Sequence, residues 1–543
     1  MTNENCRGVS PCFARKVLNR GIKTVVTGSL LTAASAGYGL DWKLENGVTV
    51  DLDTSVTYDA QWRREEADDA ILDFGGQGIL VDDGNRNFDD GDMTQNRISF
   101  STDLDINYGD GGLFVRARGW YDEVYNDDDL IEQSHPLLGA GTPKSFQQDG
   151  IDWHKSEIEL LDAFVYHTFD MGDRSASVRL GQQVVNWGES LFVNGGISSA
   201  QAPVDATKAN APGVELKDIF LPLGQLYVEL GLSENISMGA YYQYDWEETR
   251  IDAPGTYFGV DILGQESVGD TLDAVGLPVA EQTPDEGQYG IALRYLAEQL
   301  NNTEFALYYL EYNDFLPALQ LLPPILGPQL SHEYFEDIKL IGLSFGTVFG
   351  DSNVSGELSY RDGQPVQLNV PGAFYFSEAE TVQAQVSVIH LFGDTPLADN
   401  LSLTAEIGYN RVLEIEDDAT AALLGIDVDD INRALDDDRI GAGATVSLAA
   451  DYFSLANALD LKVTATYRND FNGVSAVPFT FTEGLEQFSL KTDFTYRNDH
   501  SFGISYVWFL TNPGDVIDDR GNLEFGHLTA DKDYLAAYYK YRF

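Results

Sequence analysis

The fold is decided by residues 48–62, which read VTVDLDTSVTYDAQW. Apolar residues occupy every second position over most of the stretch, from Val50 to Trp62, and Asp, Thr, Ser and Gln stand between them. Successive side chains of a β-strand point to opposite faces. The stretch therefore predicts a strand with one apolar face and one polar face.

The same alternation returns along the chain, for example in residues 98–108, 401–410 and 461–468. A soluble β-sandwich would show this pattern too. Two features favour a membrane barrel instead. The segments are about ten residues long or longer, as a tilted membrane-crossing strand requires. Their polar faces carry acids in mid-strand, which a watery lumen tolerates.

The connections between these segments alternate between short and long. Short turns are predicted near 109–112, 171–175, 232–235, 298–302, 349–353, 393–400, 451–460 and 497–500. Long polar loops are predicted near 63–96, 123–156, 188–224, 247–287, 313–333, 363–378, 411–439, 469–485 and 511–531. Short periplasmic turns and long outer loops are typical of outer-membrane barrels. The sequence thus predicts an all-β, transmembrane antiparallel barrel of about 18 strands (16–18), formed by residues 40–543 as a single domain.

The N-terminal residues have the pattern of a secretory signal peptide. A basic region containing Arg15, Lys16 and Arg20 precedes a short apolar stretch, and Ala34-Ser35-Ala36 is a typical cleavage site. We expect residues 1–36 to be the signal peptide, with cleavage at 36–39. No later segment is apolar enough over about 20 residues to be a membrane helix.

Composition excludes several classes of function. The net charge is −54, so the chain would repel nucleic acid. Both cysteines, Cys6 and Cys12, precede the apolar stretch, which leaves the predicted mature protein without thiol chemistry. We find no G-x-S-x-G or H-E-x-x-H motif and expect no enzyme, although a Ser–His pair on neighbouring strands would not show in the sequence.

The chain ends in a strand with aromatic residues at alternate positions, Tyr539, Tyr541 and Phe543. This resembles the C-terminal signal by which outer-membrane barrels are recognised for assembly. We therefore expect the barrel assembly machinery, outer-membrane lipid and lipopolysaccharide to be partners.

Two groups of residues are candidates for the path of a solute. Residues 179–190 include Arg179, Gln183, Asn186, Trp187 and Glu189. They are expected either to form a constriction of the lumen or to be a strand end with an interfacial Trp.

Arg116 and Arg118 share one face of their strand. They would form either a cationic strip opposite Asp103, Asp105 and Glu406, or ion pairs with neighbouring strands.

Two loops have unusual compositions. Residues 315–326 are apolar for an outer loop, and Phe315, Leu319 and Leu322 would either meet a hydrophobic solute or pack against other loops. An acidic loop could bind Ca²⁺ through oxygen ligands, or could simply be a solvated rim. Its carboxylates are Asp82, Asp83, Asp89, Asp90 and Asp92. We expect no other cofactor.

Several stretches resemble the bacterial outer-membrane family catalogued as domain of unknown function 1302. They include Asn186-Trp187-Gly188-Glu189-Ser190, Pro254-Gly255-Thr256-Tyr257-Phe258 and Gly356-Glu357-Leu358-Ser359-Tyr360-Arg361. The resemblance implies a porin-like barrel that accompanies a periplasmic or lipoprotein partner and an inner-membrane pump, in settings where hydrophobic compounds are used.

The leading expectation is an outer-membrane channel for hydrophobic or amphipathic molecules such as fatty acids, sterols or hydrocarbons. The alternatives are a structural barrel that docks a partner of a trans-envelope system and a membrane hydrolase.

Overall fold

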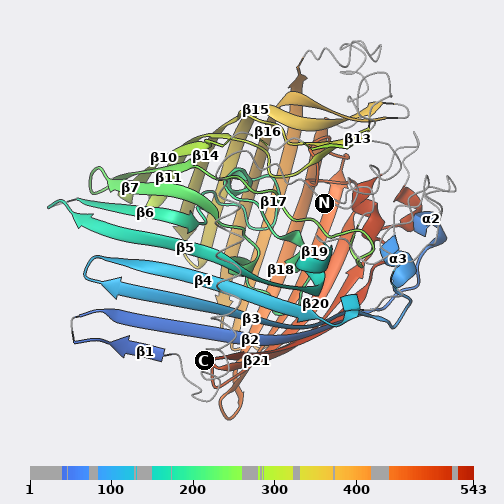
Figure 1. Cartoon of the computed structure of the whole chain (residues 1–543), viewed down its shortest axis with the longest axis horizontal. Coiled ribbons are helices and arrows are strands. Elements are labelled where there is room, and N and C mark those ends of the chain that lie inside the picture. The colour runs from blue at the N-terminus through green and yellow to red at the C-terminus, as the bar shows by residue number, and fades with distance from the viewer. Residues whose placement is uncertain are drawn as a thin grey trace, which may run out of the picture.

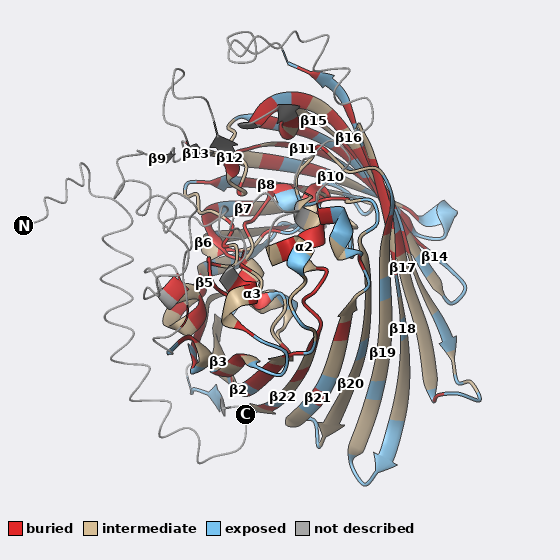
Figure 2. Cartoon of the chain, turned by 90° about the vertical axis from the view of Figure 1, so that its right-hand side faces the viewer, coloured by how far each residue is buried: buried red, intermediate tan, exposed pale blue. Residues whose placement is uncertain are grey.

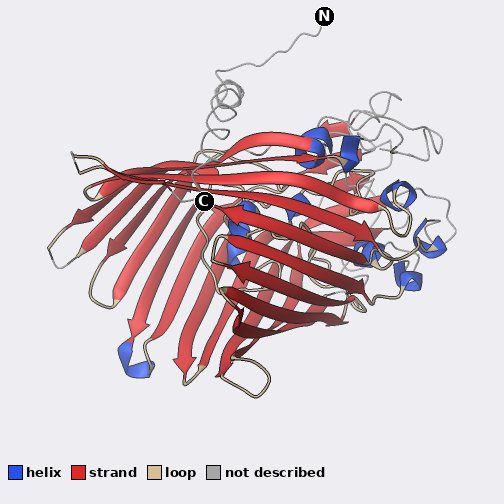
Figure 3. Ribbon diagram, turned by 90° about the horizontal axis from the view of Figure 1, so that it is seen from below, coloured by secondary structure: helices blue, strands red, loops and turns tan. Residues whose placement is uncertain are grey.

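The computed structural model describes residues 40–45, 47–72, 83–126, 130, 150–172, 174–259, 279–281, 284, 286–321, 330–370, 373–416, 439–516 and 524–543. The predicted signal peptide and its cleavage site lie outside these residues, so both stay predictions. Strands dominate the described chain, and most short helices lie at the end opposite the short turns (Figure 3). No helix among the described residues is long and apolar enough to cross a membrane.

Eighteen strands follow one another around a closed antiparallel barrel (Figure 1). They are β2 (Thr49–Arg63), β3 (Met93–Tyr108), β4 (Gly111–Asp122), β5 (Ser156–Asp170), β6 (Ser175–Gln183), β7 (Leu223–Gly231), β8 (Ile236–Gln243), β10 (Tyr289–Ala297), β11 (Thr303–Tyr312), β14 (Ile338–Phe349), β15 (Ser352–Val370), β16 (Ala373–Gly393), β17 (Asn400–Ile415), β18 (Ile440–Ala456), β19 (Leu459–Asn472), β20 (Glu486–Tyr496), β21 (His500–Phe509) and β22 (Tyr534–Arg542). The barrel closes where β22 pairs with β2, with Lys540 opposite Thr57. The predicted class and strand number are confirmed.

Smaller elements decorate the barrel. The short strands are β1 (Leu40–Lys43), β9 (Val279–Glu281), β12 (Ala318–Leu321) and β13 (Leu330–Glu333). The helical turns are α2 (Asp69–Leu72), α3 (Asp83–Asn87), η1 (Val124–Asn126), η2 (Ile151–Lys155), η3 (Ile197–Ala200), η4 (Ala206–Lys208), η5 (Leu216–Asp218), η7 (Glu298–Leu300), η8 (Pro513–Val516) and η9 (Phe525–Thr529).

The outer surface of the barrel carries the apolar face of each strand. Large apolar side chains are exposed there on strands all around the wall, including Ile98, Val165, Leu180, Ile291, Leu307, Ile341, Leu358, Val386, Ile407, Val446, Leu490 and Ile504. In water such a continuous apolar surface would be unfavourable, whereas in a bilayer it meets lipid tails. The alternation in the sequence therefore corresponds to the two faces of the wall, with apolar side chains on the outside and polar side chains on the inside.

One predicted loop is instead part of the wall. Residues 363–378 were expected to form an outer loop, but β15 and β16 continue as a paired hairpin from Gln364 and Ala379 to Val370 and Ala373. A register shift between Arg361 and Gln364 accompanies Gly363, whose φ is +87°. The extension is stable because its apolar side chains are buried against other outer segments, in a cluster of Val366, Leu368, Tyr375, Ala379, Val412, Ile415 and Ala476.

Candidate functional site

The long segment between β6 and β7, residues 184–222, runs through the interior of the barrel. The burial of the wall residues shows against which strands this segment packs (Figure 2). Lumen-facing side chains of β2–β5 are buried, among them Thr57, Asp59, Arg97, Arg118, Trp120 and Glu159. Those of β18–β20, such as Thr464, Thr466 and Ser489, are only partly buried. The interior segments therefore cover one part of the wall and leave another part open to solvent.

Two carboxylates of the wall hold the tip of this segment. Glu406, on β17, accepts hydrogen bonds from the backbone N–H groups of Leu191 (3.0 Å), Phe192 (2.5 Å) and Val193 (2.7 Å). Glu357, on β15, accepts from the N–H groups of Glu189 (2.7 Å) and Ile197 (2.8 Å). Charge-assisted hydrogen bonds of this kind are about twice as strong as neutral ones. We call residues 189–197 the tip loop and the two carboxylates its clamp.

The carbonyl groups of the tip loop are also bonded to the wall. Arg361 donates from Nη2 to the carbonyl oxygens of Gly195 (2.6 Å) and Gly196 (2.9 Å). Gln383 donates from Nε2 to the carbonyl oxygen of Asn194 at 2.8 Å. Strands β15–β17 thus accept from five backbone N–H groups of the tip loop and donate to three of its carbonyl groups.

Glycines make this close approach geometrically feasible. Gly188 has φ +117°, and a Cβ there would lie 2.8 Å from Oε2 of Glu357. A Cβ at Gly196 would lie 2.6 Å from Oε1 of the same carboxylate. Side chains at either position would push the clamp apart.

The other end of the segment is fixed by a buried network of charges. Asp205 accepts from Nη2 of Arg118 at 2.5 Å, and Arg118 also donates to Glu159 at 2.6 Å. Arg250 donates to the second oxygen of Glu159 at 2.9 Å. Burial alone would raise the pKa of the Asp205 carboxyl, but Lys208, Arg118 and Arg250 outweigh it and hold that pKa far below its usual range. Asp205 is therefore ionised.

Beyond Asp205, residues 208–218 form a strap across the wall. Lys540 of β22 donates to the carbonyl oxygen of Gly213 at 2.6 Å and to Glu215 at 3.0 Å. Lys217 donates to Asp103 of β3 at 3.1 Å. The strap therefore ties the first strands of the barrel to the last one.

A second interior segment, residues 244–259, joins the first through Arg250. The N–H of Ala253 donates to Nε2 of His154 at 3.1 Å. The hydroxyl of Tyr257 donates to the carbonyl oxygen of Asp533 at 3.2 Å. Burial lowers the pKa of His154, so its ring is neutral and can accept this bond.

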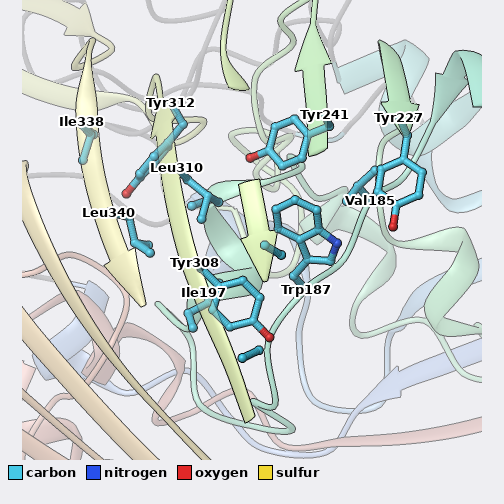
Figure 4. Packing of buried hydrophobic residues seen from close by; sticks show 13 residues of the cluster. Val185, Trp187, Ile197, Tyr227, Tyr241, Tyr308, Leu310, Tyr312, Ile338 and Leu340 are labelled. Carbon is cyan, nitrogen blue, oxygen red and sulfur yellow. The ribbon is translucent and has the colours of Figure 1, made fainter. Parts of the chain in front are cut away.

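Trp187, one of the candidates for the solute path, lies in a packed cluster of buried side chains (Figure 4). Only 4% of its surface is exposed. Its ring lies 5.1 Å from that of Tyr241, 6.1 Å from that of Tyr308 and 6.4 Å from that of Tyr227. Ile197, Leu310 and Leu340 complete the contact between the inward segment and strands β7–β14.

The other predicted residues of 179–190 have separate environments. Arg179 lies over the ring of Tyr227, with its guanidinium carbon 4.5 Å from the ring centre. Gln183 is buried and exchanges side-chain-to-backbone bonds with Gln225. Asn186 is exposed. Glu189 is half-buried, and burial together with Glu304 and Glu357 raises its pKa to about 7. Contact of these residues with a solute stays a prediction.

The two arginines of β4 form ion pairs with neighbouring strands. Arg116 pairs with Asp103 at 2.7 Å and with Asp162 at 3.1 Å. Arg118 pairs with Glu159 and Asp205, as described above. Of the acids expected to oppose them, Glu406 instead bonds the tip loop. Their role in selecting a solute stays a prediction.

The remaining predicted sites are described only in part. Phe315 is buried, whereas the side chain of Leu319 and all of Leu322 lie outside the described residues. The same holds for the side chain of Asp83 and all of Asp82. Asp92 accepts from the N–H of Asp89 at 2.9 Å and so stabilises a turn. Among the described residues no group of three or more His, Cys, Asp or Glu could hold a metal ion, and the calcium site stays a prediction.

A Ser–His hydrogen bond does occur, between Ser352 Oγ and His390 Nδ1 at 2.7 Å. It lies at the short-turn end of β15 and β16. In the part of the chain that the structure describes, no carboxylate bonds His390.

Of the residues that hold the tip loop, the sequence pattern indicates Glu406 only as an acid opposite the arginines of β4 and assigns no role to Glu357 and Arg361. Glu357 and Arg361 stand in the Gly356–Arg361 stretch, which was noted only for its resemblance. Leu191, Phe192 and Phe479 were not noted at all, yet they are 45%, 39% and 48% exposed on interior loops. Two stretches that share a family resemblance, 186–190 and 356–361, meet in space, and this shared signal was the available clue.

Fold and site together define a membrane-spanning β-barrel whose interior is narrowed by a clamped loop. The chain belongs to the family described as "Protein of unknown function (DUF1302)", whose sequence model matches residues 20–543. A comparison with curated protein sequences found no match.

Solved structures with a similar course of the chain include an outer membrane channel and a porin. OccAB1 of Acinetobacter baumannii is 11% identical, with a TM-score of 0.45 over 94% of this chain and 98% of that chain. The outer membrane channel DcaP of Acinetobacter baumannii is 12% identical, with a TM-score of 0.37 over 92% and 99%. A BenF-like porin from Pseudomonas fluorescens Pf-5 is 10% identical, with a TM-score of 0.41 over 92% and 99%. At these values the function must be argued from this chain's own residues.

Proposed function

We propose that this protein is a passive outer-membrane channel for hydrophobic or amphipathic small molecules. The observation that carries the proposal is the exposure of Leu191 and Phe192 on the tip loop inside the barrel. Apolar side chains exposed to water inside a barrel are unfavourable unless they bind something. The pair therefore marks a surface that can contact an apolar molecule.

The clamp explains why these side chains face the lumen. The backbone N–H groups of Leu191, Phe192 and Val193 all turn toward Glu406. Val193 then packs on the wall, where a Cβ at Gly408 would lie 2.8 Å from its methyl groups. Phe479 extends the apolar surface, because its carbonyl oxygen accepts from Asn194 of the tip loop at 3.2 Å.

An amphipathic solute also needs a hydrated polar surface, and strands β18–β20 provide one. Their lumen-facing side chains include the hydroxyls of Thr464, Thr466 and Ser489, which are partly exposed to solvent, and the ion pairs Lys491–Asp493 and Arg468–Asp470. An amphipathic solute could therefore slide its apolar part along the tip loop while its polar group stays hydrated. This arrangement favours the passage of solutes such as fatty acids over that of sugars.

Planar bilayers and liposomes test the proposal. Purified protein is expected to conduct ions and to carry a labelled medium-chain fatty acid and arabinose into liposomes. The double variant Leu191→Ser/Phe192→Ser should reduce fatty-acid flux about fivefold, as expected for the loss of roughly 1 kcal/mol of apolar contact. Arabinose flux should not fall.

Leu216→Ser is the matched control, since Leu216 is an exposed apolar residue of the same inward segment outside the tip loop. A protein without conductance or flux would contradict the channel and favour a barrel that docks a periplasmic partner. An unchanged ratio of fatty-acid to arabinose flux in the double variant would contradict the solute class alone. Labelling by a serine-directed probe would point to a hydrolase.

A further inference from the structure

A second interior feature lies behind the strap, away from the tip loop. It is a cavity of about 60 Å³ between residues 211–218 and the wall formed by β2, β3, β4 and β22. One water needs about 10–15 Å³ of such space, so the cavity has room for several waters or one small molecule. It lies at mid-height of β2, since Ser55, Thr57 and Asp59 line it.

Two buried polar atoms at this cavity have no hydrogen-bond partner. They are Oδ1 of Asp59 and Nε1 of Trp120, whose residues are 3% and 6% exposed. One is an acceptor and the other is a donor. Buried polar groups are nearly always satisfied, so an unpaired acceptor and an unpaired donor on two residues that line the same cavity call for a group that supplies both.

The charges around the cavity argue for a neutral ligand. Arg97 is paired with Asp122 at 3.3 Å, Arg118 with Glu159 and Asp205, and Lys540 with Glu215. An anion would have to displace one of these carboxylates and would meet Asp59 and Asp218. A cation would meet four basic groups of the lining, namely Arg97, Arg118, Lys208 and Lys540. A neutral group meets neither obstacle.

The other lining residues point to hydroxyl chemistry. Ser55, Thr57, Ser99 and Ser101 all contribute hydroxyl groups, which can rotate to donate or accept. A ligand hydroxyl can likewise donate to Asp59 and accept from Trp120. We propose that this cavity is a binding site for a small neutral molecule, or a head group, that carries one or more hydroxyls.

The proposal does not depend on transport, and binding tests it directly. In folded protein with ¹⁵N-labelled tryptophan, the indole N–H signal of Trp120 can be assigned by its loss in Trp120→Phe. Titration with glycerol should shift this signal saturably. Acetate and methylammonium, as an anion and a cation of similar size, should not.

Substitutions distinguish binding at this cavity from non-specific effects of glycerol on the protein. Asp59→Ala should weaken glycerol binding about tenfold, as expected when one buried hydrogen bond is lost. Glu229→Ala, which removes a half-exposed lumen carboxylate elsewhere, should leave binding unchanged. The indole signal of Trp246 is an internal control, because its Nε1 is also buried without a partner but does not line this cavity.

Each outcome decides the matter. A saturable shift with glycerol that Asp59→Ala weakens supports the site. A saturable shift with acetate or methylammonium instead would overturn the ligand class. No saturable shift with any probe would mean that the cavity holds only water, and the proposal would be wrong. Failure of the channel proposal in bilayers would leave this result unaffected.

Discussion

Glu406 lies 2.7 Å from the backbone nitrogen of Val193, although the two residues are 213 positions apart in the sequence. This contact joins a wall strand to the loop that narrows the barrel. One carboxylate receives three consecutive N–H groups, a geometry in which backbone dipoles converge on an anion. The position of the tip loop therefore depends on a charge at residue 406.

Neutralising that charge should loosen the tip loop. Glu406→Gln keeps the size of the side chain but replaces charge-assisted bonds with neutral ones of about half the strength. We expect a larger mean single-channel conductance with more frequent fluctuations in planar bilayers. Glu229→Gln, a lumen carboxylate away from the tip loop, should behave like the wild type. Identical traces for both variants would contradict the clamp.

A covalent tether should replace the clamp. The double variant Val193→Cys/Gly408→Cys brings two thiols together, because a Cβ at 408 would lie 2.8 Å from the Val193 methyl groups. The native cysteines, Cys6 and Cys12, both precede the described chain. In a Glu406→Gln background, oxidation should restore the narrow conductance and a reductant should reverse it. A tether without effect on conductance would show that the tip loop does not limit the channel.

Glycine 196 should be intolerant of a side chain. The Cβ of Gly196→Ala would lie 2.6 Å from Oε1 of Glu357, so either the loop or the carboxylate must move. We expect a loss of about 1–3 kcal/mol in the free energy of unfolding, as for other overpacked sites. Urea unfolding in detergent measures it. Gly231→Ala, where the nearest atom would be 3.5 Å away, is the control that should be nearly neutral.

Stability should fall as pH rises through the range of Glu189. This loop carboxyl has its pKa raised to about 7 by burial and by Glu304 and Glu357. The folded state therefore holds its proton more tightly than the unfolded state, and this contribution is complete below pH 4.5 and lost as pH approaches 7. Glu189→Gln should flatten the dependence of the unfolding free energy on pH between 5 and 8. An unchanged slope would contradict the assignment.

The two arginines of β4 should differ in structural importance. Arg118 is 5% exposed and holds Glu159 and Asp205, whereas Arg116 is 15% exposed. Arg118→Gln should cost about 3–5 kcal/mol of unfolding free energy, since it removes the cation that bridges the buried carboxylates of Glu159 and Asp205 and leaves them with Arg250 and Lys208 alone. Arg116→Gln should cost clearly less. Comparable losses on urea unfolding would show that the Asp205 network is not the main anchor of the inward segment.

The sequence by itself determined the barrel. Alternation in stretches such as 48–62 fixes which side chains face lipid, and this local property needs no knowledge of the partner strand. Turn residues between the strands fixed the count of 18. Residues 363–378 were predicted as a loop, whereas the hairpin there is stabilised by a cluster that includes distant residues such as Val412 and Ala476.

Only the tertiary structure decided what fills the barrel. The clamp joins Glu406 and Glu357 to residues about 160–215 positions away, through backbone groups that look the same in every sequence. Likewise, Trp187 is buried and Leu191 is exposed, because the burial of a side chain inside a wide barrel depends on which loops cross the lumen beside it. Local periodicity encodes the direction of a side chain from its own strand, whereas occupancy of the lumen depends on contacts between distant segments.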